Sequence, residues 1–175
     1  PDQATQDLHN RFNEKGGTLD WYCLEYWSNE LSVNIRQLKE EIKHLIQERP
    51  FVQEFLKQLG QNKKQRVLIT NAHPQSLDLK LAVTGIHNQL DQIYSSHQFG
   101  QPKESQKFWQ ALFKQQYFDP KRTLFIDDSI DVLNSAQQYG IGHLLGMRQP
   151  DSKQAPRTLD GFKTIIHFDE IFPNA

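Results

Sequence analysis

The sequence of 175 residues contains almost no cysteine, no excess of either charge and no long apolar run. Its single cysteine, Cys23, cannot form an internal disulfide, which favours a protein of the reducing cytoplasm. The net charge of −1 gives no reason to expect a nucleic acid or an acidic membrane as a partner. No apolar stretch approaches the length of a membrane span. The sequence therefore indicates a globular protein whose partner is neither nucleic acid nor membrane.

Hydrophobic residues make up 37% of the chain and aromatic residues 11%, which is enough to build a folded core. The length fits one domain, or a core with a small accessory module. The character of the sequence changes near Pro50. Residues 1–49 carry helical patterns only, whereas residues 50–175 alternate between strands and helices. We therefore expect a partial helical cap over 1–49 and an α/β core over 50–175.

Two helical patterns occupy the first of these regions. Over residues 19–31, Tyr22, Cys23 and Trp27 recur with other apolar residues at helical spacing. Over residues 35–46, one helix face collects five aliphatic residues: Ile35, Leu38, Ile42, Leu45 and Ile46. The aromatic cluster could contact a ligand, but the core of a helix pair is the commoner role for such residues.

The region after Pro50 reads as a Rossmann-like α/β fold. Helices are expected at 51–60 (closed by Gly60), 76–85, 105–117 and 131–140. Strands are expected at 65–70, 92–97, 123–126, 142–147 and 163–168. Strands separated by amphipathic helices of ordinary length predict a parallel sheet with flanking helices.

Polar residues stand at the carboxyl ends of three of these strands, where open parallel sheets bind their ligands. They are Thr70, Asn71 and His73 after the first strand, Lys103 in the loop after the second, and Asp127 and Asp128 after the third. One hydroxyl, one ammonium and two carboxylates at one rim suit a phosphate and a hard cation such as Mg²⁺.

Each of these features has a plainer interpretation when taken alone. A Thr-Asn pair at a strand end often forms a turn, and a loop lysine is usually solvated. Adjacent aspartates before a helix often cap it. A receiver domain also gathers acids, a Thr and a Lys around Mg²⁺, but there the acidic pair comes first in the chain and the lysine last. The order found here is the reverse.

In that order the chain resembles the haloacid dehalogenase superfamily of phosphohydrolases. The matching motifs are "VLITN" with Thr70, "GQPKES" with Lys103 and "FIDDS" with Asp127 and Asp128. At closer range "LDWYCLEYWS", "LITNAHP", "SSHQFGQPKE" and "LFIDDS" are similar to strings of the bacterial GMP/IMP 5′-nucleotidases of this superfamily. The resemblance runs from about residue 19 to residue 151.

This resemblance implies a Mg²⁺-dependent phosphomonoesterase whose partner is a small phosphate monoester, a purine nucleoside 5′-monophosphate. It implies that Asp128 binds Mg²⁺ and that Asp127 supports the metal directly or through water. Lys103 would neutralise the nucleophile and a phosphoryl oxygen, and Thr70 would donate a hydrogen bond to the phosphate. Asn71 would shape the phosphate cradle through its backbone amide.

The sequence leaves two alternative roles open for each of two further residues. His73 either reaches the substrate or makes a structural hydrogen bond. Asp131 supports either the Lys103 loop or the start of its own helix. Two other functions also stay open, namely a non-catalytic remnant that binds phosphate or a partner, and a phosphatase of the same superfamily that acts on sugar phosphates.

The family's nucleophile motif, of the type DxDxT, is absent from this sequence. The aspartates before Thr70 are Asp2, Asp7 and Asp20, and none follows an apolar strand. We therefore expect the first core strand to be missing, and the chain to be inactive by itself. That strand would lie between the strands 66–70 and 123–127, which should then not pair directly with each other.

Overall fold

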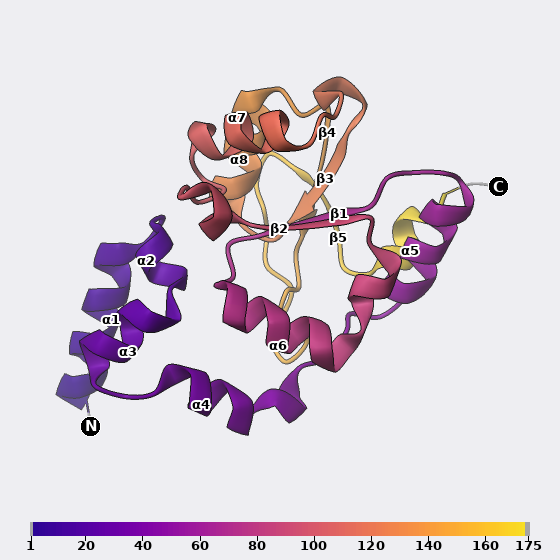
Figure 1. Cartoon of the computed structure of the whole chain (residues 1–175). Helices are drawn as coiled ribbons and strands as arrows, with labels where there is room; N and C mark the ends of the chain where they lie inside the picture. The colour runs from indigo at the N-terminus through magenta and orange to yellow at the C-terminus, as the bar shows by residue number, and fades with distance from the viewer. Residues whose placement is uncertain (1, 174–175) are drawn as a thin grey trace.

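The computed structural model describes residues 2–173 and has an α/β architecture, as predicted (Figure 1). Its α-helices are α1 (Asp2–Lys15), α2 (Leu19–Tyr22), α3 (Leu24–Leu31), α4 (Ile35–Glu41), α5 (Val52–Gln61), α6 (Pro74–Thr84), α7 (Gln106–Gln115) and α8 (Ile130–Tyr139). Its strands are β1 (Val67–Thr70), β2 (Gln92–Ser95), β3 (Leu124–Asp127), β4 (His143–Met147) and β5 (Lys163–Ile165). Short 3₁₀ helices are η1 (Lys43–Leu45), η2 (Ile86–Gln89), η3 (Ser96–Phe99), η4 (Pro120–Arg122) and η5 (Phe168–Ile171). Within this described range, no helix combines the length and the apolarity needed to cross a membrane.

Every strand pair is parallel, but the strands form two sheets and not one. β1 pairs with β2, while β4 lies between β3 and β5. Within residues 2–173 no ladder of hydrogen bonds joins β1 to β3. The expectation that these two strands do not pair directly is therefore confirmed.

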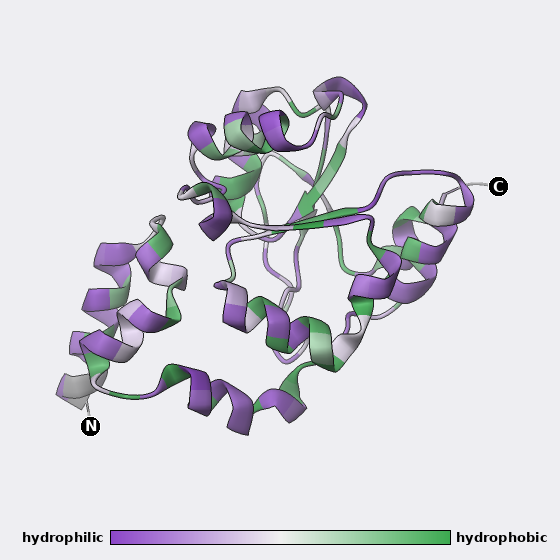
Figure 2. Ribbon diagram, viewed as in Figure 1, coloured by the Kyte–Doolittle hydropathy of each residue, from purple (hydrophilic) through white to green (hydrophobic). Residues whose placement is uncertain are grey.

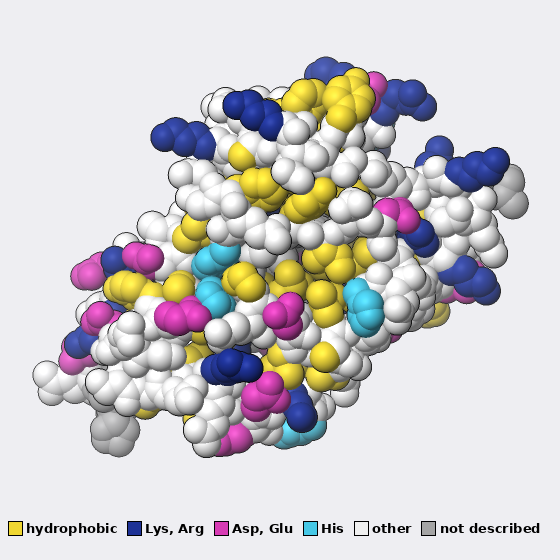
Figure 3. All heavy atoms as spheres, viewed as in Figure 1, with side chains coloured by type: hydrophobic (Ala, Val, Ile, Leu, Met, Phe, Trp, Pro, Cys, Tyr) yellow, Lys and Arg dark blue, Asp and Glu magenta, His cyan; other side chains and the backbone are white. Residues whose placement is uncertain are grey.

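The two unpaired edges are accompanied by exposed apolar side chains. Val67 on β1 is 37% exposed and Leu124 on β3 is 45% exposed. Parallel sheets normally bury both faces beneath helices, so such exposure is unusual for strands of this kind. Figure 3 shows hydrophobic side chains at the surface over the middle of the molecule, where β1 and β2 run in Figure 1. In the described part of the chain, one edge of β1 and one edge of β3 therefore have no paired strand.

The largest core cluster forms where α7 and α8 pack on the strands. Phe108, Trp109 and Leu133 are almost fully buried there, with Phe125 of β3 beside them. Trp109 meets Phe125 edge to face, with ring centroids 5.1 Å apart. Full burial of one such side chain contributes about 1.5–3 kcal/mol. A second cluster joins α5 to η5. Figure 2 shows the strands as largely hydrophobic. Packing in the two clusters holds the strands whose ends carry the candidate site.

The helix predicted over 19–31 is broken. Cys23 is extended (φ −84°, ψ 119°) and separates α2 from α3. Its sulfur accepts a hydrogen bond from the Tyr26 N–H at 3.5 Å and so caps α3. Apolar spacing continues across the break, which is why the pattern suggested one helix.

The helix predicted over 35–46 is also shorter, because α4 ends at Glu41 and η1 follows. Leu38, Ile42 and Leu45 are 47%, 53% and 55% exposed, so the expected core of a helix pair does not form from this face. The N-terminal helices pack instead through Trp27, whose ring centroid lies 4.1 Å from that of Phe12.

Glycine ends two of the predicted helices but not the third. Gly85 and Gly140 adopt left-handed conformations (φ 68° and 103°) after α6 and α8, as expected. Gly60 lies inside α5, which continues to Gln61. A Cβ at Gly60 would lie 2.7 Å from Nη1 of Arg66, so glycine here makes room for an arginine.

Candidate active site

Lys103 is buried, and both its backbone N–H and its backbone carbonyl make hydrogen bonds to side chains. Its loop follows Gly100, whose left-handed conformation (φ 63°) turns the chain after η3. The Lys103 N–H donates to Oδ1 of Asn71 at 2.9 Å, and its carbonyl accepts from Nε1 of Trp109 at 2.9 Å. Because only 8% of the residue is exposed, the alternative of a solvated surface lysine is wrong.

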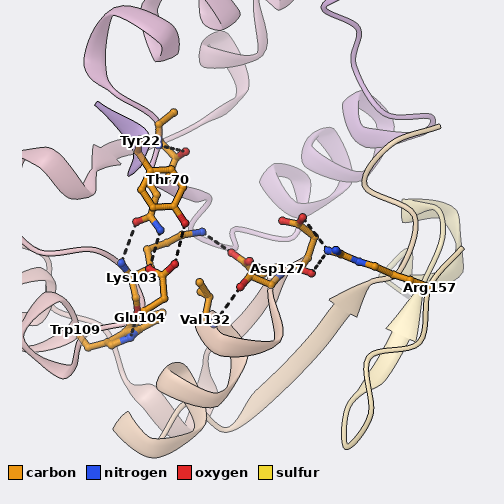
Figure 4. A network of polar contacts seen from close by, with 12 residues as sticks. Tyr22, Thr70, Lys103, Glu104, Trp109, Asp127, Val132 and Arg157 are labelled. Carbon is orange, nitrogen blue, oxygen red and sulfur yellow. Dashed lines mark hydrogen bonds and ion pairs between the residues drawn. The ribbon is translucent and has the colours of Figure 1, made fainter. Parts of the chain in front are cut away.

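The Lys103 ammonium lies against the carboxylate at the end of β3 (Figure 4). Nζ is 2.5 Å from Oδ2 of Asp127, and the two side chains are 10% and 7% exposed. The other oxygen, Oδ1, accepts the backbone N–H of Ser129 at 2.9 Å. Asp127 is therefore stabilised in a buried position by one cation and one backbone donor.

Asp128 pairs with a different cation, Arg157. Its Oδ2 lies 3.1 Å from Nη2 of Arg157, and this guanidinium also donates to the Asp128 carbonyl. Both side chains are about half exposed. The sequence analysis did not single out Arg157, because a loop arginine 29 residues further on carries no local signal.

Thr70 and Asn71 shape the end of β1. The Thr70 hydroxyl accepts the N–H of Ala72 at 3.1 Å, which leaves its own proton available for a ligand. Asn71 is 5% exposed, and its side-chain amide donates to Oε2 of Glu104 at 2.8 Å. Together with its bond to Lys103, this contact fastens the lysine loop to β1. The interpretation of these residues as a turn is confirmed, while a role in phosphate binding stays a prediction.

The N-terminal helices reach this network through Tyr22. Its hydroxyl donates to Oε1 of Glu104 at 2.8 Å (Figure 4). Burial raises the pKa of Tyr22 well above its ordinary value, so the hydroxyl stays a donor. Sequence reasoning missed both residues. Glu104 follows Lys103 directly in "GQPKES", which was the available signal, whereas Tyr22 was counted only among the apolar residues of its helix.

His73 makes a second contact between the two parts of the chain. Its Nε2 lies 2.7 Å from Oε2 of Glu25, and its ring packs edge-on against His97 at 5.0 Å between centroids. Burial lowers the pKa of His97, and the neighbouring His73 lowers it further. The structural alternative for His73 is thus observed, and a contact with substrate stays a prediction. Figure 3 shows histidines beside hydrophobic side chains where the N-terminal helices meet the rest of the molecule.

Cys23, Glu25 and His73 place three potential metal ligands within 4.8 Å of one another. Ligands of one tetrahedral zinc ion lie about 2.0–2.3 Å from the metal and so more than about 3 Å apart. The 2.7 Å between Glu25 and His73 is instead a direct hydrogen bond. We therefore regard this group as a contact between α3 and the start of α6.

Asp131 lies in the first turn of α8 and is exposed. Within residues 2–173 its side chain makes no hydrogen bond or ion pair with the Lys103 loop, and Ser129 is the residue that caps the helix. Its position near a helix N-terminus is favourable for a carboxylate. Of its two predicted roles, the structure is compatible with support of its own helix.

The chain matches the family described as haloacid dehalogenase-like hydrolase over residues 5–145. It is 37% identical over 174 residues to the GMP/IMP nucleotidase YrfG of Escherichia coli (strain K12) and to the protein of that name from Shigella flexneri. The alignment covers 99% of this chain and 78% of each relative.

Solved structures share the fold. A HAD phosphatase from Thermococcus onnurineus superposes with a TM-score of 0.78 at 18% identity, covering 97% of this chain and 78% of that one. The HAD-hydrolase YfnB from Bacillus subtilis, bound to magnesium, gives 0.67 at 20% identity, covering 98% and 78%. The TM-scores of these structures show that the fold is shared. The family match over residues 5–145 and the 37% identity to the curated relatives show the family. The chain belongs to the haloacid dehalogenase-like hydrolase family and is a phosphatase of that family.

Proposed function

We propose that the protein hydrolyses purine nucleoside 5′-monophosphates with Mg²⁺, through a phosphoaspartate formed in the complete active site. The observation that carries this proposal is the buried pair of Lys103 and Asp127, together with the Thr70 hydroxyl, whose proton is available for a ligand. A buried ammonium and a hydroxyl proton at the carboxyl ends of parallel strands are suited to bind phosphoryl oxygens.

The nucleophile is proposed to come from a strand between β1 and β3 that is not among the described residues. The unpaired edges of β1 and β3 support this, because exposed strand edges favour the addition of a strand. A parallel strand inserted there would end between Thr70 and Asp127. Its terminal aspartate would then face Lys103, which would help hold a carboxylate ionised for attack on phosphorus.

The carboxylates at the end of β3 fit a magnesium site in their chemistry. Asp127 and Asp128 supply oxygen donors, which Mg²⁺ prefers, and each oxygen can accept more than one contact. Two carboxylates do not complete six-fold coordination, so water, substrate and the proposed nucleophile would supply the rest. A bound Mg²⁺ would neutralise charge on the phosphoryl group during transfer.

The nucleotide specificity is proposed from the curated relatives, which are named GMP/IMP nucleotidases. The contact of Tyr22 with Glu104 supports a role of the N-terminal helices in substrate binding, because it brings them next to the lysine loop.

The test is phosphate release from GMP by the full-length protein that contains this chain. We expect turnover to require Mg²⁺ and to fall about 10²–10³-fold in Lys103→Ala and in Asp128→Asn, since each removes charge stabilisation from the reacting phosphate. Lys107→Ala is the matched control, because Lys107 is an exposed lysine on α7.

A folded full-length protein without Mg²⁺-dependent turnover on any nucleotide would contradict the proposal. So would a Lys103→Ala variant that keeps the activity of the Lys107→Ala control.

A further inference from the structure

A cavity of about 340 Å³ lies between the N-terminal helices and α6. Trp21 and Tyr22 line one side, Ala72 and Ser76 line the other, and Lys39 and Lys80 also border it. Trp21, Lys39 and Lys80 have no role in the phosphate site described above.

The cavity opens next to that phosphate site. Tyr22 borders the cavity and also donates to Glu104, the neighbour of Lys103. Ala72 borders it as well, and its N–H bonds the hydroxyl of Thr70. Tyr22 and Ala72 thus connect the cavity to the residues around Thr70 and Lys103.

Trp21 presents an aromatic surface to the cavity. It is 42% exposed, although its neighbour Trp27 is buried and donates its Nε1–H to the Trp21 carbonyl at 2.9 Å. The ring of Trp21 stacks on Tyr22 with centroids 5.6 Å apart. A fixed, partly exposed indole is a surface on which a nucleobase can stack.

Lys39 of α4 and Lys80 of α6 bring two positive charges to the same cavity. Among residues 2–173, neither ammonium has an ion pair or a side-chain hydrogen bond. Burial lowers the pKa of Lys39, and the nearby positive charge of Lys80 lowers it further. A ligand with hydrogen-bond acceptors would give both ammonium groups a partner, because an ammonium can only donate.

Resting on the proposed function, we propose that this cavity is the base subsite and that Lys39 and Lys80 select purines with an oxygen at position 6. Guanine and hypoxanthine present O6 and N7, two adjacent acceptors, and lysine is a common partner of this pair. Adenine presents an amino donor at position 6, which would face the ammonium groups without a hydrogen bond.

The test compares kcat/KM for IMP and AMP in the full-length protein, because these nucleotides share ribose and phosphate and differ at the 6-position region of the base. We expect a preference for IMP that falls about tenfold to a hundredfold in Lys39→Met or Lys80→Met. Lys107→Met is the control and should keep the preference. Trp21→Ala should lower kcat/KM for both nucleotides by a similar factor, since stacking does not read position 6.

An IMP-to-AMP ratio unchanged in both lysine variants would overturn the inference while leaving the nucleotidase activity intact. Absence of turnover on every nucleotide would instead contradict the proposed function. Binding of inosine and of adenosine, measured by quenching of tryptophan fluorescence, tests the base subsite independently of catalysis. Equal binding of the two nucleosides by the unmodified protein would overturn the base subsite.

Discussion

Substitutions of Lys103 and Asp127 should have strongly non-additive effects on the free energy of unfolding, because the two side chains form a buried ion pair. Their charged atoms are 2.5 Å apart and their side chains are 10% and 7% exposed. At an effective dielectric constant of about 20, the gross attraction at this distance is about 7 kcal/mol. Most of it offsets the cost of removing both charges from water, so the pair as a whole adds little net stability.

Removing one partner has a larger effect, because it leaves the other charge buried and unpaired. We expect Lys103→Met and Asp127→Asn each to lower the free energy of unfolding by about 3–5 kcal/mol. The double variant removes both charges of the pair. It should lose at least about 2 kcal/mol less than the sum of the two single losses.

Urea unfolding followed by tryptophan fluorescence measures these free energies. The matched control is the exposed pair of Arg11 and Glu30, 2.8 Å apart with side chains 51% and 39% exposed. The coupling of Arg11→Met with Glu30→Gln should stay below about 1 kcal/mol. A coupling between Lys103 and Asp127 no larger than this control would refute the reasoning that the pair is buried and mutually dependent.

Three smaller effects follow from the same structure. Tyr22→Phe removes the donor to Glu104 and should cost about 1–2 kcal/mol in urea unfolding. Because burial raises the pKa of Tyr22, the unfolded chain loses its proton first, so stability should fall as the pH rises above about 10, and less so in Tyr22→Phe. Gly142→Ala would place a Cβ 2.4 Å from the Lys121 carbonyl oxygen, and thermal unfolding should show a loss of about 1–3 kcal/mol.

The strand-end residues could be predicted from the sequence because their signal is local. Thr70 and Asp127 are each the last residue of a short strand, and the topology of parallel sheets brings such ends to one rim. Lys103 lies in a loop whose Gly100 turns the chain after the second strand. Each feature needs only a few neighbouring residues to be recognised.

The partners of these residues could not be predicted, because they come from distant parts of the chain. Arg157 is 29 residues from Asp128, and Tyr22 is 82 residues from Glu104. No pattern of spacing connects such positions before the fold is known. The break at Cys23 was missed for another reason, since cysteine is not among the residues that usually cap helices.

The charges at the site provide a further argument for a divalent cation. Lys103 contributes one positive charge, while Asp127 and Glu104 contribute two negative ones close to it. The immediate surroundings of the proposed phosphate position therefore carry a net negative charge, and the proposed nucleophile would add another. A phosphate dianion would be repelled from such a site, most strongly where water is excluded. A doubly charged cation held at the end of β3 would offset this charge, which is the physical reason to expect that phosphate binding depends on the metal.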